Sequence, residues 1–272
     1  MQIHMKKIPI LAAAVLSLAV GFSAHAQFGK PGNPTPDSII SKIFGTNLNF
    51  SADMQVDIQM PSQDNDLNVA GRIYFRGGDS RTEVDMTKIT GSKMPPHAAD
   101  QMKAMGMDKM ISISKRKTKT VYMIYPGLES YTQVTVPKSA ANTNDMQVTT
   151  TEIGKETVDN HPCVKNKYTV TDAGQDITLY AWLATDLKNY PVKIEIHSTH
   201  GGADKNAPTV ITVNFNGLNT ASPDASLFEP PLGYHVYTDA QAMAQTEMVK
   251  KMAGSGHGAM PADHPAVPPS HP

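Results

Sequence analysis

Residues 52–60 read Ala-Asp-Met-Gln-Val-Asp-Ile-Gln-Met, and this stretch decides the fold class. Apolar side chains occupy every second position, and Asp or Gln occupies the positions between them. A period of two is typical of a β-strand that buries one face and exposes the other to water. Pro61 follows directly, and we expect the strand to end there because proline cannot donate to a sheet ladder.

The chain on either side of this strand has the same β character. Further predicted strands cover residues 69–75, 80–86, 110–114, 120–125, 131–136, 147–153, 163–170, 177–183, 192–197 and 209–215. Gly77-Gly78 and Asp172-Ala173-Gly174 have the composition of short hairpin turns. Successive strands joined by short turns indicate an antiparallel meander, so we predict a mainly β (α+β) fold.

Helical patterns are few. Residues 37–45 and 95–105 begin at a proline or a capping aspartate and stop at a glycine. Residues 238–252 form a third predicted helix, which Thr238 or Asp239 caps. We therefore expect short helices to accompany the sheet.

The composition is balanced in charge. The chain has 272 residues with 24 Lys and Arg against 25 Asp and Glu, a formal net charge of −1, and a single cysteine. This balance excludes a basic nucleic-acid-binding protein, an acidic disordered tail and a disulfide-dense scaffold. Cys163 has no internal partner, so it is a buried small hydrophobe, the interpretation we favour, or else a reactive thiol or one half of an intermolecular bridge.

The first 26 residues have the pattern of a secretory signal. Lys6 and Lys7 precede an apolar run over residues 8–22, and Ala24-His25-Ala26 is a small-x-small cleavage site before Gln27. We predict a periplasmic or secreted protein. The residue directly after the cleavage site is Gln27 and not a cysteine, so a lipid anchor is not expected.

These patterns divide the chain into segments. Residues 1–26 are the predicted signal peptide, 27–47 an N-terminal linker and helix, 48–237 the sheet domain and 238–253 a C-terminal helix. Residues 254–272 are rich in Gly, Pro and His and are predicted to be disordered, because they cannot bury enough apolar surface to fold alone.

Several short motifs carry a resemblance to known families. They are Gly154-Lys155-Glu156-Thr157-Val158, His161-Pro162-Cys163, Tyr168, Trp182, Asp186-Leu187, Pro191-Val192-Lys193-Ile194-Glu195, Phe215-Asn216-Gly217 and Phe228-Glu229-Pro230-Pro231-Leu232-Gly233-Tyr234. In these the chain resembles the LolA-like outer-membrane lipoprotein carriers. It is more similar still to an exported bacterial family, domain of unknown function 4412, which shares Pro126-Gly127-Leu128 and Met-rich elements. The resemblance spans residues 50–237.

The resemblance implies a specific architecture. We expect a strongly curved antiparallel sheet, an open or half barrel of about 10–11 strands, with a few short helices on its concave face. In the relatives, the concave apolar face holds acyl chains. This sequence departs from the lipoprotein carriers by a Met-rich insertion and by lacking an obvious basic loop. Its apolar face encloses either a packed core or a cavity, and both remain open at this point.

The Met-rich segment, residues 94–110, is the most unusual part of the sequence. Ala98, Met102 and Met105 share one face of a short helix. The segment is a core-packing helix, an apolar lid over a lipid-sized cavity, or a Cu(I) site, since thioethers suit this soft metal. The predicted ligand contacts are Met94, Met102, Met105, Met107, Met110 and Trp182; the copper alternative uses Met102, Met105, Met107, Met110 and His97.

Other candidate sites are weaker. His197 and His200 lack a third ligand at metal-like spacing, and the tail histidines offer only weak scavenging of Zn²⁺ or Cu²⁺. The basic run over residues 115–119 is a predicted hairpin tip, with contact to anionic lipid headgroups as the alternative. The sequence contains no Gly-x-Ser-x-Gly, phosphate-binding or zinc-protease motif, so we expect neither an enzyme nor a cofactor.

Two functions of different class remain. The first is a cell-envelope binding or carrier protein that holds a hydrophobic small molecule, lipid or acyl chain. The second is a periplasmic copper-binding protein that uses the Met-rich segment and the His-rich tail. We expect a monomer that binds no nucleic acid, with a membrane surface or an envelope protein as a further partner.

Overall fold

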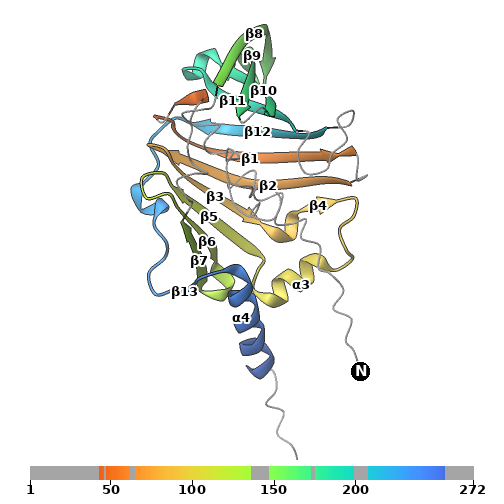
Figure 1. Cartoon of the computed structure of the whole chain (residues 1–272), viewed down its shortest axis with the longest axis vertical. Coiled ribbons are helices and arrows are strands. Elements are labelled where there is room, and N and C mark those ends of the chain that lie inside the picture. Colours follow the sequence, from red (N-terminus) through yellow and green to blue (C-terminus); the bar gives the residue numbers. More distant parts are fainter. Residues whose placement is uncertain are drawn as a thin grey trace, which may run out of the picture.

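The computed structural model describes residues 43–45, 47–61, 65–135, 147–172, 175–198 and 208–254. The predicted signal peptide, most of the predicted linker, His200 and the tail after Gly254 lie outside these residues. Within them, the chain forms one large curved sheet with two helices near one end, as Figure 1 shows. The fold is mainly β, as the sequence predicts.

The described strands form a single 13-stranded sheet. Their bounds are β1 Asn49–Met60, β2 Asn65–Arg76, β3 Asp79–Asp85, β4 Thr90–Gly91, β5 Lys109–Lys115, β6 Thr120–Tyr125, β7 Ser130–Thr135, β8 Gln147–Val158, β9 His161–Asp172, β10 Gln175–Ala184, β11 Tyr190–Ser198, β12 Thr209–Asn219 and β13 His235–Tyr237. The order is β13-β7-β6-β5-β3-β2-β1-β12-β11-β10-β9-β8, with β4 paired to β2 outside this path. The pairs are antiparallel except for β13 with β7, and β13 and β8 end the strand order without closing it.

Every predicted strand is present, although Val136 lies outside the described residues. β8 continues five residues beyond its predicted end at Ile153, to Val158. β4 and β13 were not predicted, because strands of two and three residues are too short to display an alternation.

Two hairpin turns have a clear local cause. Gly77 and Gly78 join β2 to β3 with φ angles of 58° and 92°, which glycine adopts without steric penalty. Asp159 and Asn160 join β8 to β9 with φ angles of 49° and 63°, and these residue types tolerate the left-handed region better than most. The first of these turns was predicted from the sequence.

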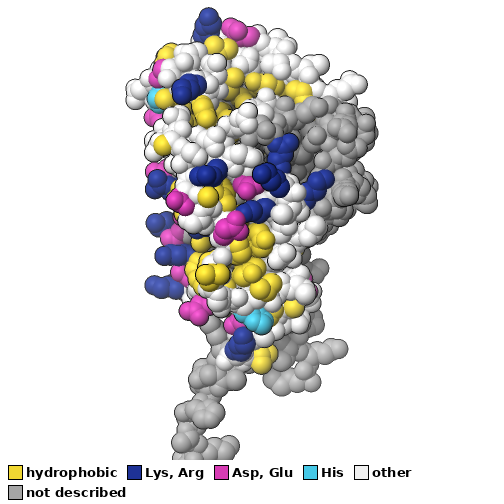
Figure 2. Space-filling view, turned by 90° about the vertical axis from the view of Figure 1, so that its left-hand side faces the viewer, with side chains coloured by type: hydrophobic (Ala, Val, Ile, Leu, Met, Phe, Trp, Pro, Cys, Tyr) yellow, Lys and Arg dark blue, Asp and Glu magenta, His cyan; other side chains and the backbone are white. Residues whose placement is uncertain are grey.

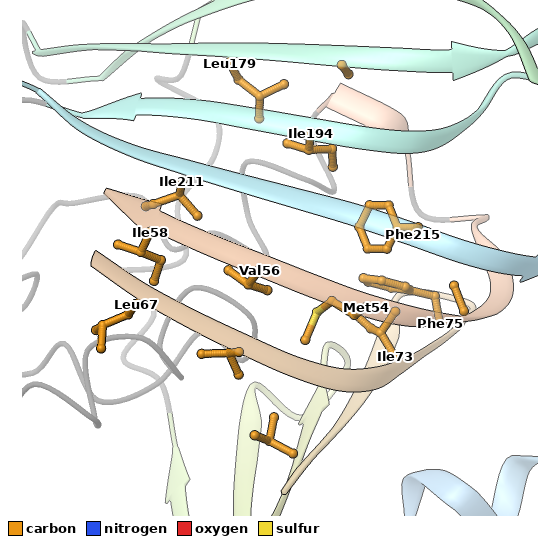
Figure 3. Packing of buried hydrophobic residues seen from close by; sticks show 14 of the residues in the cluster. Met54, Val56, Ile58, Leu67, Ile73, Phe75, Leu179, Ile194, Ile211 and Phe215 are labelled. Carbon is orange, nitrogen blue, oxygen red and sulfur yellow. The ribbon is translucent and has the colours of Figure 1, made fainter. Parts of the chain in front are cut away.

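One face of the sheet carries the main core, and we call it the inner face. In β1 it presents Phe50, Ala52, Met54, Val56 and Ile58, each at most 3% exposed. Cross-strand partners join them in one apolar cluster, the inner cluster, which Figure 3 shows over β1, β2 and β10–β12. Burial of one such side chain contributes about 1.5–3 kcal/mol, so this cluster dominates the stability of the sheet.

Aromatic rings pack within the inner cluster. The ring of Phe50 stacks on Phe75 with centroids 4.9 Å apart, and it meets Phe215 edge-on at 5.9 Å. It also meets the ring of Tyr190 edge-on at 5.6 Å. Phe50 of β1 therefore contacts rings on its two neighbours, β2 and β12, and on β11 beyond β12.

The opposite, outer face is polar over β1 and β2. Gln55 donates a hydrogen bond to Asn68, and Asn68 donates one to Asp57. Asp53 and Arg72 form an ion pair at 3.9 Å whose side chains are mostly exposed, so its contribution to stability is small. On the side shown in Figure 2, acidic and basic side chains are interspersed.

The two helices contact the sheet differently. In α4, Ala240–Gly254, Met243 is buried, and Glu247 accepts a hydrogen bond of 2.6 Å from the hydroxyl of Tyr237. Asp239 caps this helix by accepting a hydrogen bond from the N–H of Ala242. α3, Ala98–Met105, packs against the short helix η2, Met86–Lys88. Neither helix is long and apolar enough to cross a bilayer among the residues described.

Candidate functional site

A row of hydroxyl side chains crosses one half of the inner face. Strand pairing places Thr82 of β3 opposite Ser112 of β5, Ser112 opposite Met123 of β6, and Met123 opposite Thr132 of β7. We call Thr82, Ser112 and Thr132 the hydroxyl row. Each is at most 2% exposed, so hydroxyls are buried where the other half of the face buries hydrocarbon.

Ser112 is the unusual member of the row. Among the residues that the structure describes, its Oγ is the one buried side-chain oxygen or nitrogen without a hydrogen-bond partner. Ser130, on the same face, instead donates from its Oγ to the carbonyl oxygen of Leu128 at 2.8 Å. A buried hydroxyl without a partner costs about 1–3 kcal/mol, and such a group calls for a structural or functional explanation.

The strand positions around the row on β2, β3, β5, β6 and β7 are uncharged, whereas Tyr237 of β13, opposite Thr132, hydrogen-bonds Glu247 beside Lys250. In the described strands β2, β3, β5, β6 and β7, the positions that share the inner face are all neutral. They are Leu67, Val69, Gly71, Ile73, Phe75, Ser80, Thr82, Val84, Met110, Ser112, Ser114, Val121, Met123, Tyr125, Ser130, Thr132 and Val134. Burial raises the pKa of Tyr125, which keeps this phenol protonated.

Three of the predicted methionines meet at the inner cluster. Met110 is 2% exposed and belongs to the cluster, and the half-buried Met94 and Met102 pack against it. Met105 and Met107 are half-buried but lie outside the cluster as described. Helix α3, which contains Met102 and Met105, is lightly held, since none of its side chains, all of them described, is buried.

The two ends of α3 differ. His97 precedes it in a left-handed conformation, with φ 62°, and makes no side-chain capping bond. Its exposed ring lies 3.3 Å from the carboxylate of Asp100. At the other end, Gly106 has φ 71°, and a Cβ on Gly127 would lie 2.6 Å from the carbonyl oxygen of Gly106. The C-terminal end of α3 is therefore fitted closely to η3, Pro126–Leu128, while its N-terminal end is not capped by His97.

Trp182 lies apart from the methionines, on the outer face. It is three residues from Leu179, which belongs to the inner cluster, so the two side chains point to opposite faces of β10. Its indole donates a hydrogen bond to Glu156, and the Nζ atoms of Lys165 and Lys193 each lie 4.4 Å from the ring centroid. These contacts describe a residue held by charged neighbours rather than one that lines the inner face.

Cys163 is buried next to Trp182. Its Sγ donates to the carbonyl oxygen of His161 at 3.2 Å, and burial raises the pKa of the thiol. A raised pKa lowers the thiolate fraction and hence the reactivity. The structure therefore agrees with the interpretation of Cys163 as a small buried hydrophobe.

His197 and Lys115, from the weaker candidate sites, each contact carboxylates of the same chain. His197 lies 2.6 Å from Glu195, while His200 lies outside the described residues. No group of three or more His, Cys, Asp or Glu side chains in the described part of the chain is placed to hold a metal ion. Lys115, at the start of the basic hairpin, forms ion pairs with Glu229 and Asp79.

The hydroxyl row was missed at the level of sequence, although a signal existed. Ser80 and Thr82 occupy alternate positions of one predicted strand, and Ser112 and Ser114 those of another. Ser130 directly precedes a third predicted strand, which contains Thr132. These positions are in phase with apolar residues of the same strands, such as Val84 and Met110. The phase indicated a buried face, but a polar pair in a half-buried strand is more often assigned to the solvent side.

Comparisons with known proteins identify a family and a set of distant folds. The model of the family described as Domain of unknown function (DUF4412) matches residues 50–202. No curated protein matches this chain.

Among solved structures, the chain is similar to the Mycobacterium tuberculosis lipoprotein LppX. The identity is 10%, the match covers 69% of this chain and 93% of that chain, and the TM-score is 0.37. It is also similar to a Vibrio parahaemolyticus domain described as an outer membrane lipoprotein-sorting protein, with 10% identity, coverage of 76% and 97%, and a TM-score of 0.32.

Proposed function

This chain belongs to the family described as Domain of unknown function (DUF4412), and we propose that it is a binding or carrier protein that holds an apolar ligand against the inner face. The ligand class is a lipid or an acyl chain. The observation that carries this proposal is the inner cluster itself, a continuous set of buried apolar side chains on β1, β2 and β9–β12 of an unclosed sheet. Extended apolar surfaces bind ligands mainly by removing hydrocarbon from water.

The proposal assigns a role to α3. The helix has an N-terminus without a side-chain cap, its side chains are not buried, and Met102 joins it to the inner cluster. Segments with few buried contacts open at low free energy. α3 therefore acts as a lid, and Met94, Met102, Met105, Met107 and Met110 are its proposed ligand contacts. We leave Trp182 out of this set because it lies on the outer face.

The proposed location is the cell envelope, and it rests on the sequence of residues 1–26. A carrier that leaves the cytoplasm meets lipid at membrane surfaces, which fits a ligand of this class. The proposed activity is binding and requires no catalytic group.

Mass spectrometry of the purified full chain tests this function. The protein is analysed natively and, in parallel, after extraction with organic solvent. We expect a copurified lipid that dissociates in the solvent extract. Bound copper without lipid would contradict the proposal and would favour the Met-rich metal site instead, since thioethers bind Cu(I).

A variant separates the two outcomes. Replacing Met102 and Met105 by Leu keeps the volume and the hydrophobicity of the lid but removes both sulfur atoms. Lipid loading should survive this change, whereas copper loading should be lost. Val249→Leu, at a position of α4 that is 65% exposed, is the matched control for a hydrophobic replacement outside the site.

A further inference from the structure

We propose that Ser112 donates a hydrogen bond to the ester carbonyl of an uncharged lipid, whose hydrocarbon chains lie along the apolar strands of the inner face. This inference rests on the proposed function and adds the class and the orientation of the ligand. Its starting point is the buried Oγ of Ser112, which has no hydrogen-bond partner among the described residues.

The unpaired hydroxyl of Ser112 requires a hydrogen-bond partner. A serine hydroxyl offers one donor and two acceptor lone pairs, and burial without a partner costs free energy. Its cross-strand neighbours are Thr82 and the half-buried Met123. Alanine would fill a purely structural position here without that penalty. The hydroxyl is explained if its partner arrives with the ligand.

The two halves of the inner face determine how a ligand is oriented. The apolar half of the inner face, on β1, β2 and β9–β12, presents side chains such as Val56, Ile211 and Phe215. The hydroxyl half, on β3, β5, β6 and β7, contains the hydroxyl row. A ligand that covers both halves must be apolar along most of its length and polar at one end. An acylated lipid with its ester group over Ser112 has this distribution.

The side chains around Ser112 also restrict the charge of the ligand. The inner-face positions of the described strands β2, β3, β5, β6 and β7 carry no charged side chain, as given above. Burying a carboxylate or a phosphate without a cation costs several kcal/mol, whereas an ester carbonyl is a neutral acceptor. The face around Ser112 therefore favours esterified, uncharged lipids over free fatty acids and phospholipids, since the charged pair Glu247 and Lys250 contacts β13, three strands away from β5.

Three radiolabelled probes test the inference with the full chain after removal of its lipid. They are dioleoylglycerol, its dialkyl ether analogue without carbonyls, and oleate. Transfer from phosphatidylcholine vesicles to the protein is measured for the wild type, Ser112→Ala and Ser130→Ala. We expect the wild type to prefer the ester probe, and Ser112→Ala to weaken its binding by about tenfold while leaving the ether probe unchanged.

The controls make the outcomes distinct. Ser130→Ala removes a buried hydroxyl of the same face that already has a partner, so it should not change the ratio of ester to ether binding. Equal binding of ester and ether probes by the wild type would overturn the role of Ser112 and leave the proposed function standing. Preference for oleate would overturn the selection of uncharged lipids. If none of the three probes binds, the proposed function fails and this inference fails with it.

Discussion

The two halves of the inner face bury different chemistry on the same sheet. In the apolar half, the rings of Phe50, Phe75 and Phe215 pack together and exclude water. In the hydroxyl half, Thr82, Ser112 and Thr132 are buried to the same degree but contribute polar atoms. The apolar half therefore supplies stability, while the hydroxyl half gives up some stability and can supply selectivity. Stability and ligand choice are separable by mutation if this comparison is correct.

The largest expected effect lies in the apolar half. Phe50→Ala removes a ring that is 1% exposed and that contacts aromatic rings on three other strands, so it should lower the free energy of unfolding by about 3–5 kcal/mol. Urea denaturation followed by circular dichroism measures the change. Val249→Ala on the exposed side of α4 should change stability by less than about 0.5 kcal/mol. Similar losses for the two variants would remove the apolar half from its stabilising role.

Substitutions in the lid helix α3 should change the free energy of unfolding less than the core substitution does. Met102→Leu and Met105→Leu conserve volume and hydrophobicity, so each should change the free energy of unfolding by less than about 1.5 kcal/mol. Replacing both by Asp should destabilise the protein more, because the carboxylate at position 102 would face the inner cluster and the one at position 105 would be half-buried. Thermal unfolding of the two Leu variants and of the double Asp variant checks that the Asp variant is the least stable. Equal tolerance of Leu and Asp would show that α3 makes no apolar contact of consequence.

In the hydroxyl half, replacing two serines by alanine should change stability in different directions. Ser112→Ala removes a buried group without a partner and should leave stability unchanged or raise it by up to about 1 kcal/mol. Ser130→Ala removes the donor to the carbonyl of Leu128 and should lower stability by about 1 kcal/mol. Chemical denaturation of the pair measures the difference. A loss of stability in Ser112→Ala would mean that this hydroxyl has a structural partner in the ligand-free protein.

The smallest expected effect is a pH dependence at the edge of the hydroxyl half, where α4 docks on β13 and β7. Hydrogen bonds from Lys250 and Tyr237 lower the pKa of Glu247 below its usual 4.5. A lowered pKa means that the contribution of Glu247 is present above its unfolded-state pKa and is lost as the pH falls through the folded-state pKa. Hydrogen exchange in β7 and β13 should therefore increase in acid before exchange in β1 does.

Glu247→Gln provides the control for this dependence. The amide keeps the shape of the side chain but does not titrate in this range, so the acid-dependent change in β13 should disappear. The same hydrogen bond to Glu247 raises the pKa of Tyr237, and Glu247 raises that of Lys250. Their contributions are complete below their unfolded-state pKa values and are lost only in strong alkali. Acid sensitivity that persists in Glu247→Gln would assign the effect to another carboxylate.

The amino-acid sequence by itself determined the local features of this protein. The alternation over residues 52–60, the stop at Pro61 and the turn at Gly77-Gly78 all predicted what the structure contains. These features depend on the pleat of one strand and on the backbone freedom of one or two residues. Interactions within a few positions are enough to specify them, so they can be read without knowing the fold.

Tertiary structure alone decided which side chains meet. The sequence predicts Trp182 as a ligand contact, whereas its partners on β9 and β11, Lys165 and Lys193, place its side chain on the outer face. The hydroxyl row exists only because the registers of β3, β5, β6 and β7 align residues 82, 112 and 132. Whether Ser112 finds a partner depends on every atom around it, and those atoms come from strands distant in sequence. Register and hydrogen-bond satisfaction are properties of the assembled sheet, which no single strand encodes.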